Sequence, residues 1–344
     1  MTRPTTTGKA QDLITFTRST TGTYLGSDGL LKSAAINEAR IEYDASGNCL
    51  GLLMEEARTN KVTYSQDLTH SSWNKQDVTV AAAPIAAPDG TMTANHVVKT
   101  GSNGHLSKNA VGTTSDRVSV WARTVSGTGT MYLGYQGVSH EVTVTEEWQR
   151  FDAQLNNTNA YVANFRGAAT LTEVYLWGAQ VETGSFPTSY IPTSGSAVTR
   201  AADLASLAVS EFGYNQDQGT VVIGLNNNRG VAGALGDGTF NNDLRFGVVG
   251  SNIGRGTGSG FAKSVTTGVF SGQSKIAIGI QEDNYSSAGD GAGAGVNDTS
   301  ASLPPNPVNI YIGKDYGNYL NGHIKSIQYY PLRLSNAQLQ ALTV

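Results

Sequence analysis

Hydrophobic and polar residues alternate along most of the chain, and turn-forming residues separate the alternating runs. In RVSVWART (117–124) the apolar side chains of Val118, Val120 and Ala122 share one phase. Alternate side chains of a strand point to the same face, so one face of each run can be buried. In the neighbouring runs Met131, Leu133 and Tyr135 share one face, and the inward-facing candidates are Val142, Val144, Val174 and Leu176. With turns at roughly every 8–12 residues, the pattern predicts a jelly-roll β-sandwich over residues 61–200.

The same alternation returns after a break in composition near 184–206, where prolines and small residues indicate the end of one module and a linker. Residues 201–344 form a second predicted β-sandwich, with Ile276, Ile278 and Ile280 facing inward. Residues 286–307 contain few packing residues and are predicted to form a surface loop.

One helix is expected, at the C-terminus. Ser335 is a candidate N-cap, and Gln338 stands three residues later, the spacing of a capping box. Leu339 and Leu342 give this helix an apolar edge.

Residues 1–60 are predicted to form short hairpins, with turns at SDG (27–29) and DASG (44–47). Their apolar content is small, so this region is expected to pack on a neighbouring domain or subunit. The predicted fold is therefore all-β: an N-terminal hairpin region (1–60), two β-sandwiches (61–200 and 201–344) and a short C-terminal helix.

Composition and charge narrow the classes of function. The formal net charge is −4 with no basic run, which argues against a nucleic-acid surface. No apolar run approaches the roughly 20 residues of a membrane span, and Cys49 has no partner for an internal disulfide. The polar N-terminus lacks the apolar core of a signal peptide, so we expect the protein to be made in a cytoplasm.

The chain lacks the usual catalytic motifs, and we expect no enzymatic activity. Two carboxylate pairs, Glu55-Glu56 and Glu146-Glu147, could suggest glycoside hydrolysis. Adjacent residues on a strand point to opposite faces, so neither pair forms a dyad by itself. Acidic residues from distant segments could still converge, which leaves a hydrolase or lyase open.

Candidate binding residues come from two features. GDGTFNND (236–243) offers Asp237, Asn241 and Asp243 as oxygen ligands for Ca²⁺, although Asp/Asn-rich turns also arise for local reasons. Trp73 in HSSWNKQD and Tyr135 in GYQG lie in polar contexts and are candidates to stack on a glycan. Trp121 and Trp177 lie among apolar residues, which favours packing. No other cofactor is expected.

Several segments resemble bacteriophage tail-fibre and head-spike proteins. The first segment (14–60) is similar to a recurrent N-terminal region of that family, and the matching positions are Phe16, Arg18, Tyr24, Asn37, Arg40, Gly51, Leu52, Leu53, Glu55, Arg58, Thr59 and Asn60. YSQDLTHSSW with APDGTMTA resembles the start of a carbohydrate-binding-like jelly roll, and GAQVETGSFPTSYIPT with TRAAD resembles its end. LNGHIKSIQYYPLRLSNAQLQALT resembles the end of a concanavalin/laminin-G-like sandwich.

The resemblance implies a virion component: a fibre or spike subunit, commonly trimeric, that contacts other virion proteins and attaches to a host-surface glycan or other receptor. Residues 1–60 would then be the docking element. The shared motifs imply structural roles, with Glu55 and Arg58 as a hydrogen-bonded pair and Tyr190 anchoring the last strand of the jelly roll. A purely architectural protein of the baseplate or capsid, and a polysaccharide depolymerase, are the alternatives.

Overall fold

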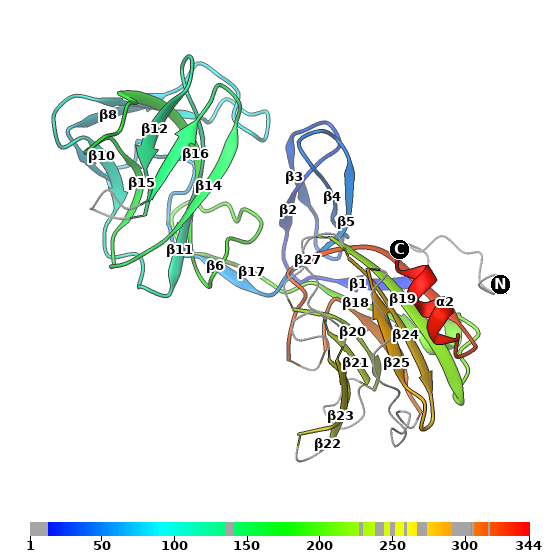
Figure 1. Ribbon diagram of the computed structural model, residues 1–344. Helices are drawn as coiled ribbons and strands as arrows, with labels where there is room; N and C mark the ends of the chain where they lie inside the picture. The colour runs from blue at the N-terminus through cyan, green and yellow to red at the C-terminus, as the bar shows by residue number, and fades with distance from the viewer. Residues whose placement is uncertain are drawn as a thin grey trace. The chain divides into compact units, whose positions relative to one another are not determined.

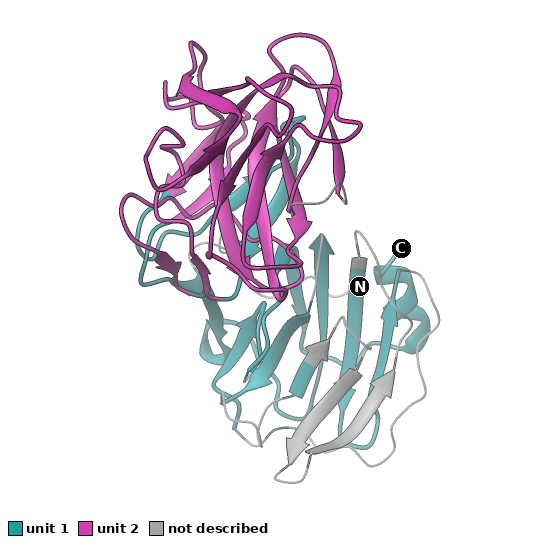
Figure 2. Ribbon diagram, turned by 90° about the vertical axis from the view of Figure 1, so that its left-hand side faces the viewer, with its two compact units in different colours: residues 1–21, 34–56, 202–344 teal, residues 22–33, 57–201 magenta. Residues whose placement is uncertain are grey.

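In the described part of the chain the regular elements are β-strands, apart from the 3-10 turn Val209–Glu211 and one short α-helix near the C-terminus (Figure 1). The computed structural model describes residues 13–134, 140–226, 230–237, 244–247, 252–257, 260–266, 274–290, 304, 306–315 and 317–344. Two compact units are present, unit 1 (1–21, 34–56 and 202–344) and unit 2 (22–33 and 57–201) (Figure 2). The prediction of an all-β fold with a C-terminal helix is confirmed.

Unit 1 is a sandwich of two antiparallel sheets. In order across the first sheet, the strands are β1 (Ile14–Thr17), β18 (Leu204–Ala208), β26 (Asn309–Ile312), β20 (Val231–Gly236), β21 (Leu244–Gly247), β22 (Asn252–Thr257) and β23 (Gly260–Thr266). Those of the second are β25 (Ser286–Gly289), β24 (Ser274–Gln281), β19 (Gln218–Asn226), β27 (Gly322–Tyr330), β5 (Cys49–Met54) and β4 (Ile41–Tyr43). Ile276, Ile278 and Ile280 of β24 are buried against Ile310 and Ile312 of β26, as their alternation predicts.

Unit 2 is a second sandwich, of two five-stranded sheets. One contains β13 (Glu141–Val144), β12 (Gly129–Tyr132), β15 (Ala160–Asn164), β10 (His105–Lys108) and β7 (Asn74–Gln76). The other contains β14 (Gln149–Gln154), β11 (Asp116–Arg123), β16 (Glu173–Thr183), β9 (Asn95–Lys99) and β8 (Val78–Ala82). Val118 and Val120 of β11 are buried with Met131 and Val162 of the first sheet, so the alternation again marks the core.

Residues 1–60 do not form a unit of their own. Strand β1 pairs with β18, and β5 inserts between β27 and β4, so these strands complete both sheets of unit 1. The hairpin β2 (Gly22–Leu25) and β3 (Leu31–Ala34) contributes Leu31 to the packing of unit 2. Strand β6 (Arg58–Asn60) pairs with β17 (Val198–Arg200), also in unit 2. Short strands with little apolar surface are not stable alone, and they become stable by joining larger sheets.

Both predicted hairpin turns are present, and Gly29 and Gly47 adopt positive φ angles of 75° and 79°. Helix α2 (Asn336–Leu342) begins at the capping box of Ser335 and Gln338, as predicted. The loop prediction for 286–307 is wrong at its start, because Ser286–Gly289 forms the edge strand β25. Its small side chains fit beneath the helix, where Ala288 packs with Leu339. Residues 291–303 lie outside the described part of the chain.

Candidate functional site

Four charged residues from separate segments meet in unit 1 and form a buried charge cluster: Arg18, Arg40, Glu55 and Asp203. The Arg18 guanidinium donates to Asp203 at 3.0 Å, and Arg40 lies 2.5 Å from Asp203 and 2.8 Å from Glu55. All four side chains are buried. Two positive and two negative charges balance, and each partner offsets part of the desolvation cost of the others.

Backbone groups extend the cluster. Arg18 also donates to the carbonyls of Ala35 and Glu38, and the Glu55 amide donates to Asp203 at 2.8 Å. Burial alone would lower the pKa of Arg40, but the charges of Glu55 and Asp203 outweigh it and raise the pKa. The cluster therefore ties the strands β1 and β5 and the start of β18 together by charge as well as by strand pairing.

In unit 2, residues of the family-like closing motif form a hydrogen-bond network around the segment 182–193. Glu182 accepts hydrogen bonds from the side chain of Gln180 and the amide and hydroxyl of Thr188. The Tyr190 hydroxyl lies 2.6 Å from Ser65 Oγ, and burial raises the pKa of Tyr190. Tyr190 thus occupies an anchoring position at the end of this sandwich.

Glu55 and Arg58 each have a further partner in the structure, and their pairing with one another stays a prediction. Glu55 forms its ion pair with Arg40, while the Arg58 guanidinium lies over the ring of Phe186 at 5.2 Å. Glu55 belongs to unit 1 and Arg58 to unit 2.

Trp73 is not the exposed stacking ring that its polar neighbours predict. Only 3% of the residue is exposed, its ring packs in the core of unit 2, and its indole N–H donates to the Tyr64 carbonyl at 3.1 Å. Lys108 lies over this ring with Nζ 5.8 Å from the centroid. The residues around Trp73 are polar, while its ring packs in the core. Sequence context alone does not distinguish this arrangement from an exposed ring.

The remaining predicted site residues fall largely outside the described residues. Tyr135 does, and so do Asn241 and Asp243 of the predicted calcium loop, of which the structure describes Asp237. Within the described residues, no group of three or more His, Cys, Asp or Glu side chains is arranged to hold a metal ion. Nor is any described helix long and apolar enough to cross a membrane.

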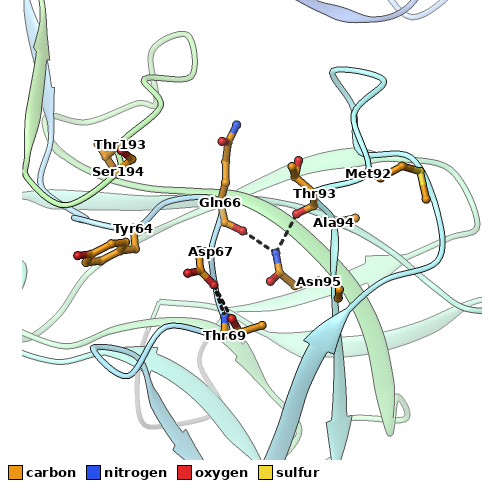
Figure 3. A pocket seen from close by; sticks show the side chains of 11 residues that line it. Tyr64, Gln66, Asp67, Thr69, Met92, Thr93, Ala94, Asn95, Thr193 and Ser194 are labelled. Carbon is orange, nitrogen blue, oxygen red and sulfur yellow. Dashed lines mark hydrogen bonds between the residues drawn. The ribbon is translucent and has the colours of Figure 1, made fainter.

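Unit 2 has an open surface pocket of about 340 Å³, within the size range of small-ligand sites. Three segments line it: residues 64–69, residues 92–95 and residues 193–194, with Ala82 of β8. Figure 3 shows the Tyr64 ring and the Met92 side chain far apart, with Asp67, Thr93 and Asn95 between them. Met92 is 63% exposed although it is a large apolar residue.

Internal hydrogen bonds hold the lining of the pocket in place. The Asn95 amide donates to the carbonyls of Gln66 and Thr93 at 2.7 and 3.2 Å, and its oxygen accepts from the Leu68 amide. Asp67 Oδ1 accepts from the amide and hydroxyl of Thr69. Asn95 is therefore occupied with structure, whereas Asp67 keeps its second oxygen, Oδ2, without a hydrogen-bond partner among the described residues.

The Tyr64 ring is fixed from one side by His70, with ring centroids 3.6 Å apart and an interplanar angle of 14°. Its hydroxyl forms no hydrogen bond within the described part of the chain. A rigid ring edged by polar groups can accept the C–H face of a ligand, because burial of apolar surface against an aromatic ring is favourable. Sequence analysis missed this site since its three segments are far apart and contain ordinary residues. The one available signal was that YSQD, TMTA and TSYIPT all belong to the family-like motifs.

Comparison with protein-family models and with curated proteins found no match. Among solved structures, two sialidase structures from Trypanosoma rangeli are 18% and 16% identical and align over 40% of this chain, with a TM-score of 0.30. The chain spans about a quarter of the sialidases' length, since 25% of each is covered. The tandem CBM22-1–CBM22-2 domain of Paenibacillus barcinonensis Xyn10C is 10% identical, with 80% of this chain and 99% of that chain covered and a TM-score of 0.30. Likeness of this degree carries no argument about ligand or activity.

Proposed function

We propose that the protein is a non-enzymatic structural component of a bacteriophage virion, a fibre or spike subunit that attaches the particle to the bacterial surface. The observation that supports this proposal is the convergence of the family-like motifs. Arg18, Arg40 and Glu55 come from three parts of the first motif region, and Asp203 from TRAAD, 185 positions after Arg18. Their contact means that the resemblance concerns one connected structural feature rather than scattered matches.

Attachment is assigned to unit 2, because its surface pocket combines an aromatic ring, an exposed thioether and polar groups. A single open pocket of this size is expected to bind weakly. In a homotrimeric fibre, and with several fibres per particle, linked binding raises the overall affinity without any new contact.

Membership of the virion can be tested on purified particles. Gradient-purified phage from cells that carry the gene in its native context are analysed by mass spectrometry and by immunogold labelling. We expect peptides of this chain in the particle fraction and label at one defined place on the particle. Their absence from infectious particles would contradict the proposal.

Attachment is tested separately, by incubating labelled purified protein with host cells and measuring phage adsorption in its presence. We expect saturable binding and slower adsorption. A protein that is in the virion but does not bind cells at saturation would instead be an architectural baseplate or capsid protein. Release of reducing ends from host polysaccharide would contradict the non-enzymatic assignment and indicate a depolymerase.

A further inference from the structure

The charge of the surface pocket restricts the ligands it can take. Asp67 is the one formally charged residue among the eleven that line it, and none of these carries a positive charge. Lys75 is not a lining residue: its ammonium donates to the His70 carbonyl at 2.7 Å, and the charge of Asp67 opposes the lowering of the Lys75 pKa that burial causes. His70 Nδ1 forms a hydrogen bond with Ser72 Oγ. An acidic ligand would therefore meet a carboxylate with no lining cation to pair with it.

The uncommitted groups of the pocket match a ligand with many hydroxyls. Asp67 Oδ2 is a free charged acceptor, and the Tyr64 hydroxyl and the Gln66 amide form no hydrogen bonds within the described part of the chain. Ser194 is exposed beside them. Hydroxyl donors bonded to a carboxylate form charge-assisted hydrogen bonds, which are stronger than neutral ones.

The pocket also has apolar groups, and these suit a ligand that has an apolar face besides its hydroxyls. The Tyr64 ring, the Met92 thioether and the methyl groups of Ala82 and Ala94 line the same space as the polar groups. A pyranose has C–H faces and a rim of hydroxyls, so it satisfies both sets at once. A purely apolar ligand would leave Asp67 desolvated without a partner.

We infer that this pocket binds an uncharged sugar residue of a surface polysaccharide and discriminates against sugars that carry a carboxylate. The inference rests on the proposed attachment function and names its ligand class. Asp67 supplies both the binding contact and the discrimination, since the same oxygen accepts a hydrogen bond from a sugar hydroxyl and repels an anion.

Methionine methyl groups provide a direct readout in the intact protein. The chain has four methionines, of which Met92 lines the pocket and Met131 lies fully buried in the core of the same unit. In ¹³C-methyl-methionine spectra, titration with neutral sugars (glucose, galactose, rhamnose, N-acetylglucosamine and their oligosaccharides) should shift the Met92 signal and leave Met131 unchanged. Glucuronic acid and N-acetylneuraminic acid should bind at least about tenfold more weakly.

Asp67→Asn removes the negative charge of the side chain but keeps a group that can form hydrogen bonds. Asparagine keeps the Oδ1 acceptor for Thr69, so the local turn is retained. Affinity for the neutral sugar should fall about tenfold, and the preference over acidic sugars should shrink to within about threefold. Glu147→Gln, which removes an exposed carboxylate of unit 2 that does not line the pocket, is the matched control and should change neither.

Equal or tighter binding of the acidic sugars by the unaltered protein would overturn the inference. So would the lack of a Met92 shift with every neutral sugar when the protein still binds cells, and in that case the proposed attachment function would stand. Sugar binding without cell binding would have the opposite meaning: the pocket assignment would hold and the attachment function would fail.

Discussion

The two sandwiches cover an outer sheet face in different ways. In unit 1, helix α2 places Leu339 on the six-stranded sheet against Val222, Ala277 and Tyr330. In unit 2, the irregular segment 83–94 and Tyr190 cover the sheet that contains β16, packing on its aromatic side chains. One cover is a helix over aliphatic and small residues and the single ring of Tyr330, and the other is a loop over several aromatic rings.

Hydrogen bonding explains the difference in side chains. A helix satisfies its own backbone groups, so it can cover a sheet with apolar side chains alone. A loop leaves backbone carbonyls that need donors, and in unit 2 one indole donates to such a carbonyl while a second donates to a side-chain hydroxyl of the loop. Trp148 donates to the Ala86 carbonyl at 2.9 Å, and Trp177 donates to Thr93 Oγ1 at 2.9 Å. The same loop contributes Met92 and Thr93 to the lining of the surface pocket, so the cover that needs polar partners is also the one that borders the pocket.

The units can be followed independently because of where their reporter residues lie. All four tryptophans belong to unit 2, and the single cysteine, the exposed Cys49, belongs to unit 1. Tryptophan fluorescence therefore reports unfolding of unit 2, and a fluorophore on Cys49 reports unit 1.

The largest expected effect comes from breaking the loop cover. Trp177→Ala removes a ring that is 1% exposed, lies 4.7 Å from the Tyr190 ring and holds Thr93. We expect the free energy of unfolding of unit 2 to fall by about 3–5 kcal/mol. Denaturant titration followed by the remaining tryptophans measures it, and the Cys49 probe should not move. A loss below about 1 kcal/mol would show that the loop cover is not structural.

Breaking the helix cover should have the next largest effect, in the other unit. Leu339→Ala empties a fully buried site under α2, and the unfolding free energy of unit 1 should fall by about 2–4 kcal/mol. The Cys49 probe detects this change, with Leu332→Ala, 42% exposed, as control. A shift in the tryptophan transition instead would contradict the assignment of the helix to unit 1.

Removal of the Tyr190 hydroxyl, which anchors the segment that covers the sheet of unit 2, is expected to have a smaller effect. Tyr190→Phe keeps the ring and removes the hydrogen bond to Ser65, so unit 2 should lose about 1–2 kcal/mol of unfolding free energy. The tryptophan transition midpoint in urea measures this loss. An unchanged midpoint would mean that the hydroxyl makes no net contribution.

The smallest expected effect is on the stability of unit 2 at low pH. Burial alone would raise the pKa of Asp116, but hydrogen bonds from Lys61, Thr183 and the Thr113 amide outweigh it and hold the pKa below its usual value. A carboxylate with a depressed folded-state pKa stabilises above its unfolded value of about 3.9 and loses that contribution as the pH falls below it.

Thr183→Val removes one of these donors, so it should reduce the loss of unit 2 stability between about pH 4 and pH 2. Tryptophan-detected urea titrations across this range test it. A steeper acid dependence in the variant would contradict the assignment.

Local features of the fold were predictable from sequence. The repeated isoleucines of KIAIGIQ identified the face of β24 that lies in the sandwich core, and Ser335 with Gln338 marked the start of the helix. These signals depend on neighbours in the chain, where strand and helix periodicities act directly. The partners of residues 1–60 were not predictable, because Ile14 pairs with Leu207 and no local pattern specifies such a distant register.

The candidate site was predictable to a lesser extent. Trp73 was placed outside because its neighbours are polar, although burial depends on which face of the segment meets the core. The pocket depends on three separate segments: Tyr64 and Ser194 pair in an isolated β-bridge, Met92 comes from a third segment, and Asn95 holds two of these segments together. Tertiary convergence of this kind leaves no periodicity in the sequence.

Competition for adsorption tests the central claim most directly. Phage are mixed with host cells in the presence of purified wild-type protein or the Asp67→Asn variant, and free phage are counted over time. The account predicts that the wild type slows adsorption in a saturable way and that the variant needs about tenfold more protein for the same effect. An adsorption rate that saturating wild-type protein leaves unchanged would contradict it.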